Sequence, residues 1–317
     1  MIKTIKRIFK GIGNFVILRV DGGLGSVILQ YALGLNITQK TGKKVKFDGT
    51  WFEGDSRDCD KKWTYRLLIK KLFPNIDFEL ASKKEIKFYK KYYYYANPKT
   101  WVYNDLLFKN KEPIYYDGYY SHYRYWADTE KLLQKNLDFS GWELNEANKK
   151  MKEEIENSDY SIGIHIRRGD FVNLGWCCIE KDYYIKGIKY IQEKANCTVK
   201  LFFFSNDMEY VKNEILPEFE GVNYTLVDIN DVDNGHFDMY LLSLCRSQVI
   251  ANSTFSICAA LLNNNDNKIV IAPDTWGYNI GKDNSNGQYD GIEKSIQNPK
   301  WVILNHETGD IIEKTKE

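Results

Sequence analysis

The second half of the chain alternates short apolar runs with helical patterns, and this alternation restricts the fold more than any other feature. Runs typical of buried strands occupy residues 161–166, 200–204, 224–227, 248–251 and 268–272. Helical patterns fill the intervals at residues 181–194, 208–216, 236–246 and 254–263. Because parallel strands need a helical crossover between them, the pattern predicts a parallel, doubly wound α/β sheet.

The first half begins in the same way and then becomes less regular. A strand at 15–20 runs into the glycine-rich turn DGGLGS at 21–26, and an apolar helix separates it from a second strand at 44–47. Residues 51–145 are rich in tyrosine and weakly periodic, and we interpret them as helices and loops. This β-α-β start predicts a second α/β unit.

We expect two domains in the 317 residues. A helix and linker at 149–158 separate the two halves. The boundary is therefore placed between an amino-terminal domain at 1–155 and a carboxyl-terminal domain at 156–317.

Charge and cysteine usage exclude several classes of protein. The 44 basic and 43 acidic side chains nearly cancel, whereas a protein that binds nucleic acid through its phosphates usually carries a basic excess. The six cysteines form no C-x-x-C pair and the four histidines are scattered, so neither a zinc site nor a disulfide scaffold is predicted. A reducing cytoplasmic location is the simplest interpretation.

The amino terminus has two interpretations. Ile2, Ile5, Phe9 and Ile12 fall at helical spacing with basic residues between them. Such a segment, here residues 1–12, can form a basic amphipathic helix that lies peripherally on the inner face of a membrane, and an ordinary frayed terminus is the alternative. No run of about twenty apolar residues occurs, so no transmembrane span is predicted.

Polar clusters follow four of the predicted strands at their carboxyl ends, the edge at which doubly wound sheets bind ligands. The clusters are Arg167, Arg168 and Asp170, then Ser205, Asn206 and Asp207, then Asp228, and finally Asn252, Ser253 and Thr254. Arginine grips phosphate oxygens with a fork of donors, and the start of a helix offers hydroxyl and free N–H groups to an anion. The sequence therefore predicts a site for a phosphorylated ligand, most simply a nucleotide.

Each of these features also has a structural interpretation. The arginine cluster is compatible with a surface ion network, and Ser253 and Thr254 with helix caps. His165 on its strand is either a structural or a catalytic histidine. Asp231 and Asp233 form an acidic loop rather than a metal site, since they supply too few ligands.

The glycine-rich turn imitates a dinucleotide-binding fingerprint. Gly23 and Gly25 stand at a strand-to-helix turn, but the third glycine of the motif is replaced by Ile28. The fingerprint is therefore weak, although the glycines still allow a ligand to approach the backbone closely.

Four segments together resemble the motifs of the α-1,2-fucosyltransferases, and the bacterial members are similar in size. The segments are GGLGSVILQYALG at 22–34, IGIHIRRGDFV at 162–172, FFFSNDMEYVKNEI at 202–215 and DMYLLSLCRSQVIANSTFSICAALLN at 238–263. Their order and spacing match the family across nearly the whole chain.

The resemblance implies a GT-B-like fold, in which two Rossmann-like domains with parallel doubly wound sheets face each other across a cleft. It implies that the carboxyl-terminal half binds GDP-fucose as co-substrate and that a glycan acceptor faces the amino-terminal half. The implied reaction transfers L-fucose to the 2-hydroxyl of a terminal galactose or related sugar. The family inverts the anomeric centre and needs neither a divalent metal nor another cofactor.

The resemblance also carries over site residues by position. Catalytic candidates are Arg167, Asp170 and His165. Substrate-binding candidates are Gly23, Gly25, Ser26, Arg168, Asp207, Asp238, Asn252, Ser253, Thr254, Phe255 and Ser256. Arg167 is expected to stabilise the charge that develops on the β-phosphate. The base that accepts the proton of the acceptor hydroxyl is Asp170, His165 or Asp21.

Three departures from the family pattern leave alternatives open. Ser26-Val27 replaces the usual Asn-Gln, Ile257-Cys258 replaces paired tryptophans, and Ser205-Asn206-Asp207 replaces Ser-Asp-Asp. Another nucleotide-sugar donor, or a catalytically idle carbohydrate-binding homologue, is compatible with these changes. A composition rich in lysine, asparagine and isoleucine is typical of an AT-rich bacterial genome, and surface-polysaccharide synthesis on the cytoplasmic face of the membrane would fit the basic amino terminus.

Overall fold

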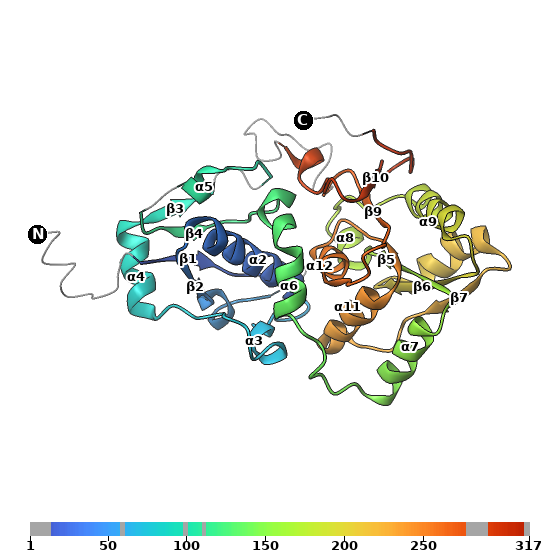
Figure 1. The fold of residues 1–317 in the computed structure, drawn as a ribbon, viewed down its shortest axis with the longest axis horizontal. Helices are drawn as coiled ribbons and strands as arrows, with labels where there is room; N and C mark the ends of the chain where they lie inside the picture. Colours follow the sequence, from blue (N-terminus) through green and yellow to red (C-terminus); the bar gives the residue numbers. More distant parts are fainter. Residues whose placement is uncertain (1–13, 58–60, 98–100, 110–111, 277–290, 314–317) are drawn as a thin grey trace, which may run out of the picture.

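The computed structural model describes residues 14–57, 61–97, 101–109, 112–276 and 291–313. It contains a four-stranded sheet with strand order β2-β1-β4-β3 and a six-stranded sheet with order β10-β9-β8-β5-β6-β7. All strand pairings within these two sheets are parallel. Figure 1 shows the two sheets side by side with helices between them. The structure confirms the predicted α/β class and the two parallel sheets of a GT-B-like arrangement.

The four-stranded sheet belongs to the first half of the chain. Its strands are β1 (Phe15–Arg19), β2 (Lys44–Asp48), β3 (Tyr94–Ala96) and β4 (Tyr115–Asp117). Its helical elements are α2 (Leu24–Thr41), η1 (Thr50–Glu53), α3 (Ile69–Leu72), α4 (Lys83–Tyr92), α5 (Leu106–Lys109), η2 (Tyr123–Tyr125), η3 (Ala127–Thr129) and α6 (Glu130–Asn136). Gly42 ends α2 in the left-handed conformation, with φ of 70°, which glycine adopts without strain.

The six-stranded sheet belongs to the second half. Its strands are β5 (Tyr160–Ile166), β6 (Val199–Ser205), β7 (Asn223–Leu226), β8 (Ser247–Val249), β9 (Val270–Pro273) and β10 (Val302–Leu304). Its helical elements are α7 (Glu146–Glu156), α8 (Gly169–Asn173), α9 (Lys181–Ala195), α10 (Met208–Tyr210), η4 (Val211–Ile215), η5 (Leu216–Phe219), η6 (Val232–Asn234), α11 (Gly235–Leu244), α12 (Thr254–Leu262) and η7 (Ile292–Lys294).

Every residue of β5 is buried, because helices cover both faces of the sheet. Ile162, Ile164 and Ile166 pack into the cluster that includes α9. The opposite face carries Gly163, where an added Cβ would lie 2.6 Å from the side chain of Leu242 on α11. A larger residue at this position would therefore push α11 away from the sheet.

The main errors of the sequence interpretation lie in the tyrosine-rich middle and near the carboxyl end. Residues 51–145 contain strands β3 and β4, not only helices and loops. Both strands have three residues, which is too short for a period of two to be read. Strand β10 was not expected, and the helix predicted at 208–216 divides into α10 and the π-helix η4.

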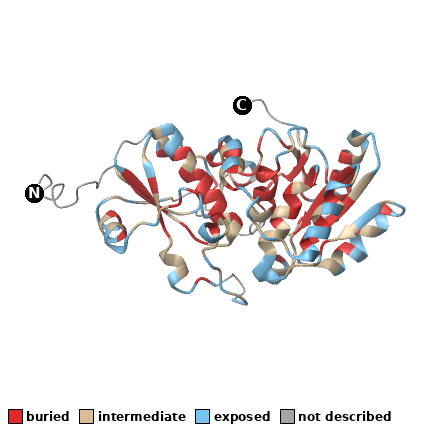
Figure 2. Ribbon diagram, turned by 60° about the horizontal axis from the view of Figure 1, so that its bottom comes forward, coloured by how far each residue is buried: buried red, intermediate tan, exposed pale blue. Residues whose placement is uncertain are grey.

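One hydrophobic core runs through both halves of the molecule, because α2 and α12 pack against each other. Figure 2 shows buried residues continuing from each sheet into the helices between them. Within the described ranges, no helix is both long enough and apolar enough to cross a bilayer. The basic segment 1–12 lies outside those ranges.

Candidate functional site

Arg167 directly follows the buried strand β5, at the carboxyl edge of the six-stranded sheet. Its Nη2 donates to Asp170 Oδ2 over 2.7 Å, which fixes the direction of the guanidinium. Its Nε is buried and has no hydrogen-bond partner among the described residues. A buried donor on a permanent cation favours an anionic ligand, since leaving it unpaired is costly.

Arg168 is held by the loop that follows β6. Its guanidinium carbon lies 3.8 Å from the ring centre of Tyr210, and its Nε lies 3.3 Å from Asp207 Oδ2. Its backbone N–H donates to Asn206 Oδ1 over 2.9 Å, and Asn206 Nδ2 donates to Asp170 Oδ1 over 3.4 Å. The loops after β5 and β6 thus hold both arginines in place. Sequence reasoning missed Tyr210, whose only signal was its place three residues after Asp207.

The start of α12 faces the glycine turn of the other half. Ser253 Oγ accepts from the Phe255 N–H over 3.4 Å and caps the helix. Thr254 Oγ1 lies 3.4 Å from Ser26 Oγ, although 228 positions separate them in the chain. An added Cβ on Gly25 would lie 2.7 Å from the Thr254 carbonyl carbon, so only glycine allows this approach.

Asn252 and Ser256 are bound to the protein itself. The Asn252 side chain donates to the backbone carbonyls of Trp276, over 2.6 Å, and Cys177, over 3.3 Å. Its buried Oδ1 has no partner in the described part of the chain. Ser256 is fully buried and donates to Ala251 O. The structure therefore gives Ser256 a role in the helix turn and does not support the predicted substrate contact.

His165 is buried beneath the start of α12. Its ring stacks on Phe255, with 5.0 Å between the ring centres and 29° between the planes. Burial, assisted by the charge of Arg167, lowers the pKa of His165 to about 3. An imidazole that stays neutral at neutral pH and binds protons this weakly is poorly suited to act as a base. It supports Phe255 instead.

Asp238 lies in the first turn of α11. Its Oδ1 accepts from Asn230 Nδ2 over 2.6 Å, and Asn230 in turn pairs with Asn148 on α7. Burial raises the pKa of Asp238 to about 7, and the hydrogen bond from Asn230 offsets this only partly. Asp238 is therefore a polar position whose charge changes near neutral pH.

Asp21 precedes the glycine turn at the carboxyl end of β1. Its carboxylate accepts from Gln30 Nε2 over 3.2 Å and lies 3.2 Å from Arg19 Nη2. Burial raises the pKa of Asp21, while Arg19 and Gln30 act in the opposite direction. Sequence reasoning missed Arg19 and Gln30, whose only signal was their place on either side of the turn.

The Asp231 side chain forms its hydrogen bonds within its own acidic loop. Asp231 Oδ1 accepts from the Asn234 N–H over 3.0 Å and caps η6, as the loop interpretation predicted. Across the described ranges, no group of three or more His, Cys, Asp or Glu side chains is placed to hold a metal ion. Metal-independent activity stays a prediction.

Comparison with known proteins gives a family and named relatives. The model of Glycosyl transferase family 11 matches residues 66–305. The chain is 27% identical to an alpha-1,2-colitosyltransferase of Escherichia coli, over 83% of this chain and 92% of that protein. It is also 27% identical to the O-antigen biosynthesis glycosyltransferase WbnK of Escherichia coli, over 81% of this chain and 93% of that protein.

Among solved structures, the chain is similar to the fucosyltransferase NodZ from Bradyrhizobium. The TM-score is 0.49 at 15% identity, with 78% of this chain and 93% of that chain covered. A likeness at this level says nothing of what the present chain binds.

The family match spans well over half of the chain and includes both arginines and the whole of α12. It contains three of the four sequence segments on which the resemblance was drawn, at 162–172, 202–215 and 238–263, while the segment at 22–34 precedes it. The chain belongs to glycosyl transferase family 11.

Proposed function

We propose that this protein transfers L-fucose from GDP-fucose to the 2-hydroxyl of a terminal galactose, with inversion and without a metal ion. The observation that carries the proposal concerns Arg167, whose buried Nε has no hydrogen-bond partner among the described residues. This arginine lies at the carboxyl edge of the six-stranded sheet, where α12 begins. A diphosphate supplies the acceptor oxygens that such a donor requires. The capped start of α12, with Ser253 and Thr254, provides further N–H and hydroxyl groups.

In the proposed reaction the bond between C1 of fucose and the β-phosphate oxygen breaks, and a bond from C1 to the acceptor oxygen forms. Negative charge grows on the β-phosphate, and Arg167 stabilises it in an orientation set by Asp170. Arg168, fixed by Asp207 and Tyr210, binds the same diphosphate. Both arginines are positioned before the ligand arrives, so little reorganisation is needed.

Asp21 is the proposed base for the acceptor hydroxyl. His165 is neutral and too weak a proton acceptor, and Asp170 orients Arg167, the arginine assigned to the donor diphosphate. The raised pKa of Asp21 makes it a better proton acceptor than an ordinary carboxylate. It lies on the amino-terminal half, next to the turn that touches the start of α12.

GDP-colitose is a second candidate donor. A relative of this chain carries the name alpha-1,2-colitosyltransferase, and Ser26-Val27 replaces the Asn-Gln expected of fucosyltransferases. In either case the product would enter a surface polysaccharide, in keeping with a relative named for O-antigen biosynthesis. Cytoplasmic synthesis fits the five cysteines of the described residues, which are free thiols.

The test is release of the nucleoside diphosphate by the purified protein in EDTA: GDP from GDP-fucose, GDP-colitose or GDP-mannose, and UDP from UDP-galactose. Each donor is measured alone and with a panel of β-galactosides. We expect release from GDP-fucose that rises with one galactoside, and NMR of the product should show an α-1,2 linkage. Faster release from GDP-colitose would favour the second candidate. Release from UDP-galactose alone, or release that requires a divalent metal, would overturn the proposal.

A further inference from the structure

Three aromatic side chains gather on the segment that follows β2 in the amino-terminal half. The ring centre of Tyr65 lies 6.1 Å from that of Trp51 and 5.6 Å from that of Trp63. All three side chains are half-buried, so each retains exposed surface. We call these three residues the aromatic cluster.

The aromatic cluster is separate from the core. Among the described residues, none of its three members belongs to a hydrophobic core cluster, whereas the neighbouring residues Phe52 and Leu67 pack against the main core. The rings are therefore not placed by core packing. Exposing aromatic surface to water is unfavourable, and such a surface outside the core often marks a binding site. In a glycosyltransferase it can serve as a surface for a sugar ligand.

Backbone contacts join the described residues on the two sides of this segment. The Tyr65 N–H donates to Ser56 O over 2.7 Å, and the Ser56 hydroxyl donates to Tyr65 O over 3.0 Å. Arg57 and Thr64 form an antiparallel bridge between these points. Phe52 packs edge-on against Trp51 at 4.9 Å and anchors it to the core. The rings are therefore held in place before a ligand binds, which lowers the entropy cost of binding.

The aromatic cluster adjoins the reaction centre proposed above. An added Cβ on Gly23 would lie 3.3 Å from Tyr65 Cε1, so the tyrosine ring rests on the glycine turn. The same turn contacts the Thr254 backbone through Gly25, and Asp21 is its first residue. A ligand on the rings would thus lie beside both the proposed base and the proposed donor site.

We propose that Trp51, Trp63 and Tyr65 form the acceptor subsite and bind the pyranose rings of a saccharide. The apolar C–H face of a galactoside matches the face of an aromatic ring, and its hydroxyl groups remain at the edge of the stack, beside the glycine turn that Tyr65 touches. This inference rests on the proposed function, because it assigns the second substrate of that reaction. It adds the residues that select the acceptor.

The test measures saccharide binding directly. Saturation-transfer NMR with methyl β-D-galactoside and lactose, in the presence of GDP, is applied to wild type, W51A and W63A. W63F keeps a ring at the same position, and Y224A removes an exposed aromatic side chain on β7, in the other half of the molecule. Circular dichroism confirms that each variant is folded, and calorimetry measures its GDP affinity.

We expect W51A and W63A to weaken saccharide binding about tenfold or more, as loss of a central aromatic anchor does. W63F should retain most of the affinity, Y224A all of it, and GDP affinity should be unchanged throughout. Unchanged saccharide affinity in folded W51A and W63A, or no saccharide binding by wild type, would overturn the proposal. Ring-dependent saccharide binding without sugar transfer from any donor would support the subsite and reject the proposed function.

Discussion

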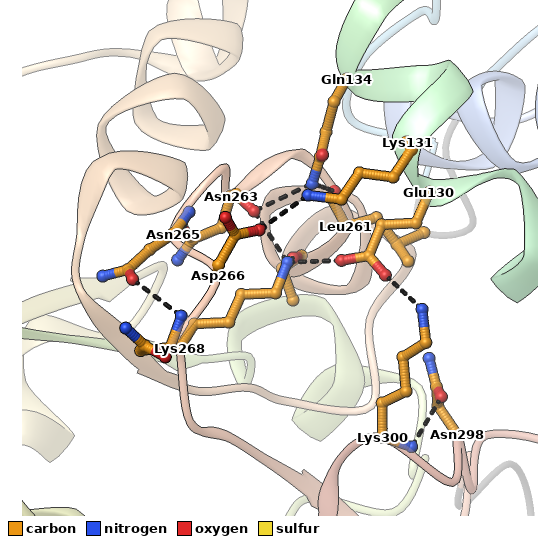
Figure 3. A network of polar contacts seen from close by, with 12 residues as sticks. Glu130, Lys131, Gln134, Leu261, Asn263, Asn265, Asp266, Lys268, Asn298 and Lys300 are labelled. Carbon is orange, nitrogen blue, oxygen red and sulfur yellow. Dashed lines mark hydrogen bonds and ion pairs between the residues drawn. The ribbon is translucent and has the colours of Figure 1, made fainter.

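The replacement E130Q tests how the two halves of the molecule are joined. Glu130 begins α6 and pairs with Lys268 Nζ over 2.6 Å and Lys300 Nζ over 3.0 Å (Figure 3). The Glu130 and Lys268 side chains are only 10% and 13% exposed. Lys268 lies two residues before β9 and Lys300 two residues before β10, so these ion pairs connect the amino-terminal half to the six-stranded sheet.

The expected loss in the free energy of unfolding of E130Q depends on the burial of the ion pair and on the hydrogen-bond partners that Lys268 keeps. Removing one member of a buried ion pair typically costs 3–5 kcal/mol, roughly, because the other charge is left without compensation. In E130Q the amide oxygen still accepts from Lys268, which also donates to Ala260 O and Asn263 O. We therefore expect the lower end, a loss of about 3 kcal/mol in the free energy of unfolding. In K300Q an exposed partner is removed, and the loss should be about 0–1 kcal/mol.

Urea unfolding, followed by tryptophan fluorescence, gives the free energies by linear extrapolation. Burial opposes the charged form of Glu130, but Lys268 and Lys300 more than offset it and lower its pKa below the usual 4.5. The stability from this carboxylate is therefore present above pH 4.5 and lost as the pH falls through the lowered pKa. The difference between wild type and E130Q should shrink in acid. A loss in E130Q no larger than in K300Q, or a difference that persists in acid, would refute the reasoning.

Three further replacements test the site. R167A should remain folded and lose about 10²–10³ in turnover, as removal of a preorganised donor does, and wild-type GDP release would contradict this. G25A should lower the thermal midpoint and turnover, because its Cβ would lie 2.7 Å from the Thr254 backbone, whereas G141A, with nothing within 4 Å, should change neither. D238N should raise the melting temperature at pH 8 but not at pH 4. Because the pKa of Asp238 is raised to about 7 in the folded protein, wild type loses stability as the pH rises from near 4 to 7, whereas D238N does not. An equal change in melting temperature at both pH values would show that the pKa of Asp238 is not raised.

The regular parts of the fold could be predicted because the central strands of the second half, β5, β6, β8 and β9, are largely buried on both faces. Such strands form short apolar runs, of which LFFF in β6 is the clearest example, and in β5 isoleucines alternate with small or polar residues before the two arginines. Once the sheet was known to be parallel, Arg167, Arg168 and Asp207 had to share one edge. In the structure the Arg168 side chain pairs with Asp207, and the Arg168 backbone N–H donates to Asn206 in the loop after β6.

Other features depend on contacts between segments far apart in the chain, which no local pattern records. Ser26 meets Thr254 across 228 positions, and the sequence suggested only that Gly25 was available for a close approach. Glu130 resembles an ordinary surface charge in sequence, yet it is buried by its lysine partners. Strands β3 and β4 were missed because three tyrosine-rich residues are too few to show a period.

GDP affinity, measured by isothermal titration calorimetry in EDTA, tests the central claim most directly. The claim is that the arginines after β5 bind the diphosphate at the edge where α2 meets α12. Wild type and Y224A should bind GDP equally well, and R167A should bind it at least about tenfold more weakly, as expected for loss of a charge-assisted hydrogen bond. Equal GDP affinity in folded R167A and wild type would contradict the claim.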